Sequence, residues 1–223
     1  MNYICDKVYC LIYEPYINER KNKLLSEFAR IGLTDVKFII NEKRPNNITS
    51  EQSVAYGHMK CYMDALSKNY KRIIVMEDDI LFLKDVNLLN IMFLNTPRDA
   101  DVVLYDYHFY KQYPLLLNKL VNDPAPYIKI NAEDLRLGTC MLLTDKAMKH
   151  IIFNQLNNRS YADYYTCYHR DSIDQYIDKS LKRYIPKINL CIQREYINTN
   201  SRRDKNNFHS YYRYQIINLN NYI

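Results

Sequence analysis

The sequence is poor in glycine, lacks tryptophan and has no long apolar segment. Only 3 of its 223 residues are glycine, and none is tryptophan. No segment fits the pattern GxxxxGK[ST], which excludes a P-loop nucleotide-binding protein. No apolar run approaches the roughly 20 residues that a membrane-spanning helix needs. Charges at Asp6 and Lys7 interrupt the stretch that a signal peptide would keep apolar, so we expect no signal peptide and no transmembrane segment.

The cysteines give no sign of a zinc site or a disulfide framework. No two of them form a CxxC pair, and no cysteine–histidine spacing fits zinc. Most stand in apolar segments, so we interpret them as reduced core thiols of an intracellular protein. The six are Cys5, Cys10, Cys61, Cys140, Cys167 and Cys191.

Charge and composition narrow the choice of partners. The 31 basic and 25 acidic residues give a net charge of +6. This small excess forms no basic stripe, which argues against a nucleic-acid partner and suits a small anionic substrate. The 23 tyrosines and the heavy use of asparagine, isoleucine and lysine suggest an AT-rich genome, as in a virus or a low-GC bacterium. We expect a cytoplasmic protein, in the host cytoplasm if the source is viral.

Apolar periodicity predicts alternating strands and helices, the pattern of an α/β fold with a mostly parallel central sheet flanked by helices. Pro15 stops the first strand, and Gly32 ends the first helix. A single domain over residues 1–195 and a C-terminal tail over 196–223 follow from this reading. Residues 107–128, rich in tyrosine and proline, are expected to form an irregular insertion. The expected strands are 3–13, 36–40, 73–76, 101–105, 137–143 and 185–192, and the expected helices are 17–31, 51–68, 88–94, 145–154 and 171–184.

Residues 72–82 (RIIVMEDDILF) are the stretch around which the chain is organised. A short apolar run with β-branched residues predicts a buried strand, and it leads directly into Glu77, Asp78 and Asp79. Open α/β sheets bind their ligands at the carboxyl ends of such strands. Glu77 and Asp79 leave the same face of an extended chain, which suits Mg²⁺ or Mn²⁺ shared with substrate phosphates. The alternative reading is an acidic surface turn.

Four segments, taken in order, resemble glycosyltransferase family 25, the lipopolysaccharide and collagen-type galactosyltransferases. Three positions depart from the family pattern: Ile12 replaces an asparagine, Gly57 a serine, and Leu142 an aromatic residue. The resemblance covers roughly residues 3–195. The segments are 8–12 (VYCLI) leading to Arg20, 53–58 (SVAYGH), 74–79 (IVMEDD), and 137–143 (LGTCMLL) followed by Ile173 and Asp174.

This resemblance implies a GT-A-like (Rossmann-like) fold, a bound Mn²⁺ or Mg²⁺, a nucleotide-sugar donor and inversion at the anomeric carbon. The expected metal ligands are Asp79 and Glu77, with His209 of the tail closing over the ion. Asp174 is the expected catalytic base, with Asp171 in reserve or as a helix N-cap. The expected donor-binding residues are Tyr13, Arg20, His58, Glu77 and Asp78.

The predicted function is therefore an inverting, metal-dependent hexosyltransferase. UDP is the expected nucleotide, galactose or glucose the expected hexose, and a carbohydrate or glycoprotein hydroxyl the expected acceptor. Two alternatives stay open: a catalytically silent nucleotide-sugar-binding module on the same fold, and a metal-dependent phosphotransferase that uses the same acidic cluster.

Overall fold

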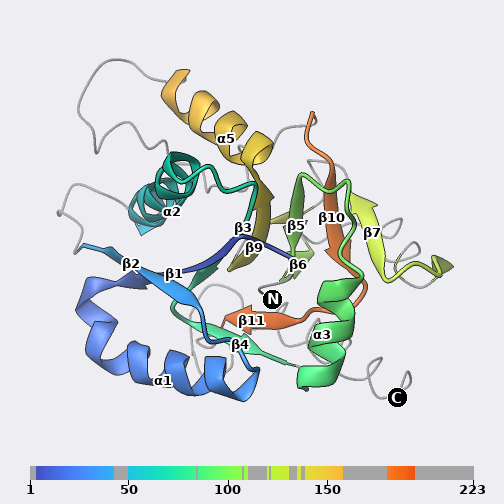
Figure 1. Cartoon of the computed structure of the whole chain (residues 1–223), viewed down its shortest axis with the longest axis horizontal. Coiled ribbons are helices and arrows are strands. Elements are labelled where there is room, and N and C mark those ends of the chain that lie inside the picture. Colours follow the sequence, from blue (N-terminus) through green and yellow to red (C-terminus); the bar gives the residue numbers. More distant parts are fainter. Residues whose placement is uncertain are drawn as a thin grey trace.

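A computed structural model describes residues 4–42, 50–83, 85–106, 108–109, 120, 122–130, 135–136, 139–157 and 180–193. Within these residues a seven-stranded sheet forms the centre of the molecule, in the order β2-β1-β3-β9-β5-β10-β7 (Figure 1). Its strands are β1 (Lys7–Tyr13), β2 (Val36–Asn41), β3 (Arg72–Glu77), β5 (Val102–Leu104), β7 (Tyr127–Ile130), β9 (Cys140–Thr144) and β10 (Arg183–Pro186).

Most strands of this sheet run in one direction. Strands β2, β1 and β3 are parallel to one another, and β10 is parallel to β5. Strand β9 is antiparallel to both β3 and β5, and β7 is antiparallel to β10. Five of the described strands therefore share one direction and two oppose it, which confirms the α/β fold class and makes the sheet a mixed one. The sequence did not predict the two reversed strands.

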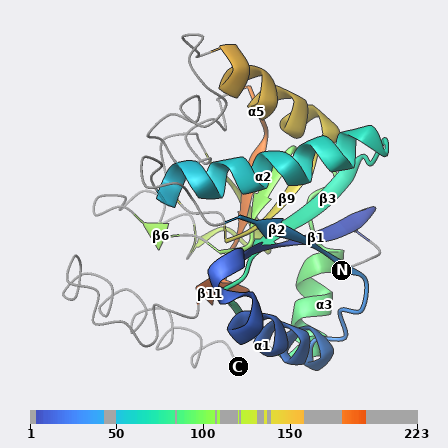
Figure 2. The ribbon, with the colours of Figure 1, turned by 90° about the vertical axis from the view of Figure 1, so that its left-hand side faces the viewer.

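Helices cover both faces of the sheet. Helices α2 (Ser50–Ser67) and α5 (Asp145–Asn157) lie on one face, while α1 (Ile17–Arg30) and α3 (Val86–Leu94) lie on the other (Figures 1 and 2). Each face forms its own apolar core, because side chains of a strand alternate between its two sides. Residue Ile73 of β3 thus packs toward α2, and Ile74 packs toward α1 and α3.

The predicted ends of the first helix are confirmed. A single 3-10 turn, η1 (Glu14–Tyr16), links β1 to α1 and contains Pro15. Gly32 follows α1 with φ of 69°, a left-handed conformation that glycine adopts without steric cost. The Leu33 N–H then donates to the Phe28 carbonyl at 2.8 Å, which closes the helix end.

A second, small sheet lies beneath the central one. It pairs β4 (Ile80–Phe82) antiparallel with β11 (Cys191–Gln193), and a further short pair joins β6 (His108–Phe109) to β8 (Leu135–Arg136). Glu27 of α1 holds β4 in place: its Oε1 accepts the Phe82 N–H at 2.8 Å and an Arg30 N–H at 2.6 Å. The Arg30 guanidinium also donates to the Phe82 carbonyl at 2.7 Å.

Three of the predicted segments are wrong in part. Arg183 and Tyr184 were predicted to end the helix 171–184, but they belong to strand β10. The predicted strand 185–192 is divided between β10 and β11, which belong to different sheets. The end of the predicted irregular insertion, Tyr127 and Ile128, lies in β7. Residues 171–179 lie outside the described residues.

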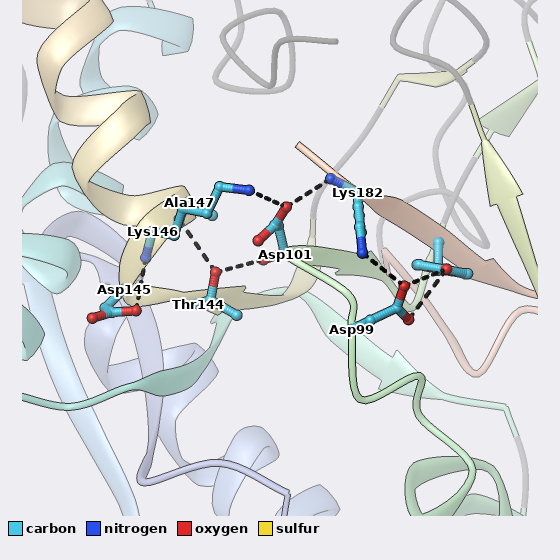
Figure 3. Close-up of polar contacts among 8 residues, drawn as sticks. Asp99, Asp101, Thr144, Asp145, Lys146, Ala147 and Lys182 are labelled. Carbon is cyan, nitrogen blue, oxygen red and sulfur yellow. Dashed lines mark hydrogen bonds and ion pairs between the residues drawn. The ribbon is translucent and has the colours of Figure 1, made fainter. Parts of the chain in front are cut away.

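The amino-terminal edge of the central sheet is tied together by charged groups (Figure 3). One carboxylate oxygen of Asp101, just before β5, accepts the Lys182 N–H and the Lys146 ammonium, each at 2.8 Å. Asp99 receives the Lys182 ammonium and the Tyr184 hydroxyl, each at 3.2 Å. These bonds join the starts of β5, β10 and α5, and they lie at the edge opposite the acidic strand end.

None of the described helices is long and apolar enough to cross a membrane.

Candidate active site

The carboxyl edge of the sheet brings together the ends of β1, β3 and β5. In the parallel register Tyr13 stands level with Asn41, and Leu11 stands level with Glu77. Asp78 and Asp79 form the turn between β3 and β4. The predicted acidic cluster therefore lies where open α/β sheets bind ligands.

Helix α2 approaches this edge very closely. A Cβ atom at Gly57 would lie 2.5 Å from Leu11 Cδ1, so the absence of a side chain lets the helix pack against β1. The Asn41 amide donates to the Ser53 carbonyl at 2.9 Å, which anchors the first turns of α2 to the end of β2. This close packing places His58 next to the end of β3.

His58 lies behind Glu77, within the fold. Its side chain is 0% exposed, and its Nε2 lies 3.3 Å from Glu77 Oε1. On its other side, the Tyr62 hydroxyl lies 3.3 Å from His58 Nδ1. The Glu77 side chain is 21% exposed, so it reaches solvent while His58 does not. His58 therefore contacts the acidic cluster through Glu77, and its predicted contact with a donor stays a prediction.

Asp78 is bound on both carboxylate oxygens. Its Oδ2 accepts the Tyr13 N–H at 2.8 Å, and its Oδ1 pairs with the Arg20 guanidinium. Burial raises the pKa of Asp78, and the Tyr13 N–H and the Arg20 charge oppose that rise. Arg20 also stacks over the Tyr16 ring at 4.3 Å. The predicted donor-binding residues Tyr13, Arg20 and Asp78 therefore form one connected group at the end of β1.

Asp79 is the remaining acid of the triplet and is half-buried in the turn after β3. Among the residues that the structure describes, no three His, Cys, Asp or Glu side chains gather as a complete metal-binding set. Mg²⁺ and Mn²⁺ sites in phosphate-transferring enzymes use one or two protein carboxylates and complete the shell with water and substrate phosphates. Asp79 and Glu77 supply such a partial oxygen set, so the residues present fit a divalent ion bound together with a diphosphate.

Asp106 is a further buried acid beside the candidate site, and the sequence reasoning did not single it out. It follows β5, is 1% exposed, and accepts the Thr139 and Cys140 N–H groups at 3.3 and 3.0 Å. Burial raises the pKa of Asp106 to about 7, and the Glu77 charge adds to that rise. The Thr139 carbonyl in turn accepts the Glu77 N–H at 2.8 Å. The sequence did contain a signal for Asp106: it is a carboxylate at the end of a predicted strand, at the same edge of the sheet as Glu77.

Three predicted site residues lie outside the described residues. These are Asp171 and Asp174, the candidates for the catalytic base, and His209, the candidate third metal ligand. Residues 194–223 lie outside as well, so the predicted placement of the tail over the donor site stays a prediction. Strand β11 ends at Gln193, whose register partner is Ile80, one residue after Asp79.

Comparisons with known proteins give distant structural likenesses and assign no family. No family model and no curated protein matches the sequence. The galactosyltransferase LgtC in complex with donor and acceptor sugar analogues is 12% identical, with 79% of this chain and 70% of that chain covered and a TM-score of 0.43. Drosophila β1,4-galactosyltransferase 7, in complex with manganese, UDP-Gal and xylobiose, is 13% identical, with 92% and 79% covered and a TM-score of 0.40.

Two other matches come from different settings. A glycosyltransferase involved in glycosylation of the major capsid of PBCV-1 is 10% identical, with 72% of this chain and 69% of that chain covered and a TM-score of 0.39. The inositol-1-phosphate CTP transferase of T. maritima is 13% identical, with 91% and 75% covered and a TM-score of 0.41. The chain is thus distantly similar in structure to glycosyltransferases and to a CTP transferase. At these scores the likeness concerns the fold alone.

Proposed function

We propose that the chain is an inverting, divalent-metal-dependent glycosyltransferase that moves a hexose from a nucleotide-sugar donor to a carbohydrate or glycoprotein hydroxyl. UDP-galactose or UDP-glucose is the proposed donor. The observation that carries the proposal is the position of Glu77, Asp78 and Asp79 at the carboxyl end of β3, next to the end of β1. The diphosphate of a nucleotide-sugar donor needs a bound cation to neutralise its charge. Carboxylates at the ligand-binding edge of the sheet can hold that cation.

The acids of the triplet have two proposed roles. Asp79, with Glu77, would hold Mn²⁺ or Mg²⁺, and the bound ion would neutralise the charge of the departing nucleoside diphosphate. Asp78 is already occupied by Arg20 and the Tyr13 N–H, so it would fix the end of β1 rather than bind the ion. Tyr13 and Tyr16, whose rings lie 5.7 Å apart, would then offer aromatic surface to the nucleotide base.

The catalytic base is proposed from the family resemblance. An inverting transfer needs a group that removes the proton of the acceptor hydroxyl as it attacks the anomeric carbon. Asp174 is the proposed base, and Asp171 is the reserve. An Asp174→Asn variant should bind donor as the wild type does and lose transfer.

Donor class and metal dependence can be tested together by thermal shift. Wild-type protein is screened with UDP, GDP, CMP and their sugars, with and without Mn²⁺. A ligand that binds only the native state stabilises it by about 2.7 kcal/mol at a concentration 100 times its Kd. We expect a Mn²⁺-dependent shift with UDP compounds in the wild type and its loss in Asp79→Ala. Asp35→Ala is the matched control, because Asp35 is an exposed carboxylate just before β2, at the end of that strand opposite Asn41.

The outcomes separate this function from its competitors. Metal-dependent binding followed by release of UDP and formation of an inverted glycoside supports the proposal. Binding without transfer to any sugar acceptor indicates a silent nucleotide-sugar-binding module. Release of inorganic phosphate or transfer of a phosphoryl group indicates a phosphotransferase. A full UDP shift in Asp79→Ala would remove the proposed metal role of that residue.

A further inference from the structure

Glu77 is connected to two buried side chains, His58 and Tyr62, by a series of hydrogen bonds. Tyr62 and His58 are both 0% exposed and lie one helical turn apart on α2. The Tyr62 hydroxyl lies 3.3 Å from His58 Nδ1, and His58 Nε2 lies 3.3 Å from Glu77 Oε1. These hydrogen-bonded side chains therefore extend from the apolar core to the carboxyl end of β3.

We propose that Tyr62 and His58 are positioning residues that orient the Glu77 carboxylate for binding a metal–diphosphate. This inference rests on the function proposed above, and it assigns to Tyr62 a role that its apolar surroundings do not suggest. Neither residue touches the donor or the ion. Both act through Glu77. Of these three side chains, that of Glu77 is the one that reaches solvent.

The hydrogen atoms shared by Tyr62, His58 and Glu77 can be placed consistently. Glu77 Oε1 is an acceptor, so His58 Nε2 carries the hydrogen that points to it. With its hydrogen on Nε2, the His58 ring accepts at Nδ1, and the Tyr62 hydroxyl is the donor. Every hydrogen points toward Glu77, and successive hydrogen bonds in one direction strengthen one another. Glu77, as a carboxylate that only accepts, sets this tautomer of His58, and the Tyr62 hydroxyl holds it by donating to Nδ1.

The three hydrogen-bonded side chains are held rigidly, because they belong to two elements that pack against each other. His58 and Tyr62 belong to α2, and Glu77 belongs to β3 (Figure 2). Gly57 brings the helix within contact of Leu11 on the adjacent strand β1. Groups behind a metal ligand that are held on helices and strands keep that ligand in its productive orientation. Loss of such a group typically lowers metal affinity or activity by about 10-fold or more.

The test compares two tyrosine hydroxyls of the same core. Tyr62→Phe removes the hydroxyl that bonds to His58, and Tyr9→Phe removes one that bonds to Asp64 of α2 at 2.7 Å. Both tyrosines are 0% exposed and pack between α2 and the sheet. Calorimetric titration with Mn²⁺ in the presence of UDP should show about a 10-fold weaker Mn²⁺ affinity in Tyr62→Phe. Tyr9→Phe should bind as the wild type does. Equal affinities in the two variants would overturn the inference.

A second pair of variants covers the case in which Tyr62→Phe does not fold. His58→Ala should weaken Mn²⁺ binding at least as much as Tyr62→Phe. His58→Gln keeps an amide donor at similar reach, so it should recover part of that loss. A merely structural role of His58 would predict changed melting temperatures with the same Mn²⁺ affinity in every folded variant, which contradicts the inference.

The failure of the inference can be distinguished from failure of the proposed function. Side-chain NMR needs no ligand: the His58 ring ¹⁵N signals should change in Glu77→Gln and in Tyr62→Phe, and should stay unchanged in Tyr9→Phe. If the wild type binds no nucleotide with Mn²⁺, the proposed function fails. If the His58 signals do not respond to Glu77→Gln or Tyr62→Phe, the hydrogen-bonded series Tyr62–His58–Glu77 is refuted, whether or not the wild type binds a nucleotide.

Discussion

At the scale of single residues, Asp106 is subject to opposing influences. Its burial favours the neutral acid, whereas the Thr139 and Cys140 N–H groups favour the carboxylate. Burial is the stronger cause and raises the pKa of Asp106 to about 7. An aspartate in an unfolded chain has a pKa of about 3.9. The folded chain therefore binds the proton more tightly than the unfolded chain does.

This difference predicts a pH dependence of stability. Between about pH 4 and pH 7 the native state holds more protons at Asp106 than the unfolded state, so the free energy of unfolding falls as pH rises, by up to about 1.4 kcal/mol per pH unit from this group. The contribution is complete below about pH 4 and is lost as pH passes about 7. In Asp106→Asn this part of the slope should disappear. Urea unfolding of both proteins between about pH 5 and pH 8 measures the difference, and identical slopes would contradict the expected pKa.

The same residue illustrates what sequence reasoning could and could not find. The triplet Glu77–Asp79 was predictable, because a buried strand followed by carboxylates is a local pattern. The partners of Asp106 are 33 and 34 residues away, so nothing near it in the sequence marks it as buried. Likewise, His58 could be placed on a helix, but its burial behind Glu77 depends on how closely α2 packs against β1.

At the scale of elements, helix α1 supports the small sheet under the acidic turn. Glu27 is 7% exposed and accepts the Phe82 N–H, which would otherwise be a buried donor at the end of β4. Removing a buried hydrogen-bond partner typically costs about 1–3 kcal/mol. Glu27→Ala should therefore lower the free energy of unfolding by that amount.

The matched control for this prediction is Glu19→Ala on the same helix. The Glu19 side chain is 64% exposed and pairs with Lys23 across one turn, an exposed ion pair of the kind that contributes little to stability. Urea unfolding of the two variants compares the buried and the exposed glutamate directly. If both variants lose the same stability, Glu27 does not hold β4 in the way described.

Strand direction was the property of the elements that the sequence did not reveal. An interior strand is apolar on both faces whichever way it runs, so β9 was predicted as a strand but its reversal was not. Arg183 and Tyr184 were predicted to end a helix and instead form the start of β10. Their strand is fixed by pairing with Val102 and Val103 of β5, contacts that join residues about 80 positions apart.

At the scale of the whole molecule, the two edges of the central sheet differ in chemistry. The carboxyl edge carries the candidate active site, and the amino edge carries the bonds around Asp101. Stability and ligand binding should therefore be separable. Asp101→Ala leaves the Lys182 N–H without its carboxylate and should cost about 1–3 kcal/mol of unfolding free energy. Its Mn²⁺-dependent UDP affinity should match that of the wild type.

Lys149→Ala serves as the control at the same edge. The Lys149 side chain is 64% exposed and lies 3.6 Å from Asp145, so its removal should change stability by no more than about 1 kcal/mol. Thermal melting and UDP titration are measured for both variants. Loss of UDP affinity in a folded Asp101→Ala protein would show that the two edges are coupled.

The directions of β1 and β11 have a practical consequence for attaching the protein to a surface or a label. Asp6 binds the Lys71 and Arg72 N–H groups, so the described chain enters at the amino edge of the sheet. It leaves through β11, whose last residue pairs with Ile80 beside the acidic turn. An affinity tag or an immobilising linker placed before Asp6 therefore enters the fold on the side away from Asp79. Binding sensors built on this protein should be anchored through the amino-terminal end.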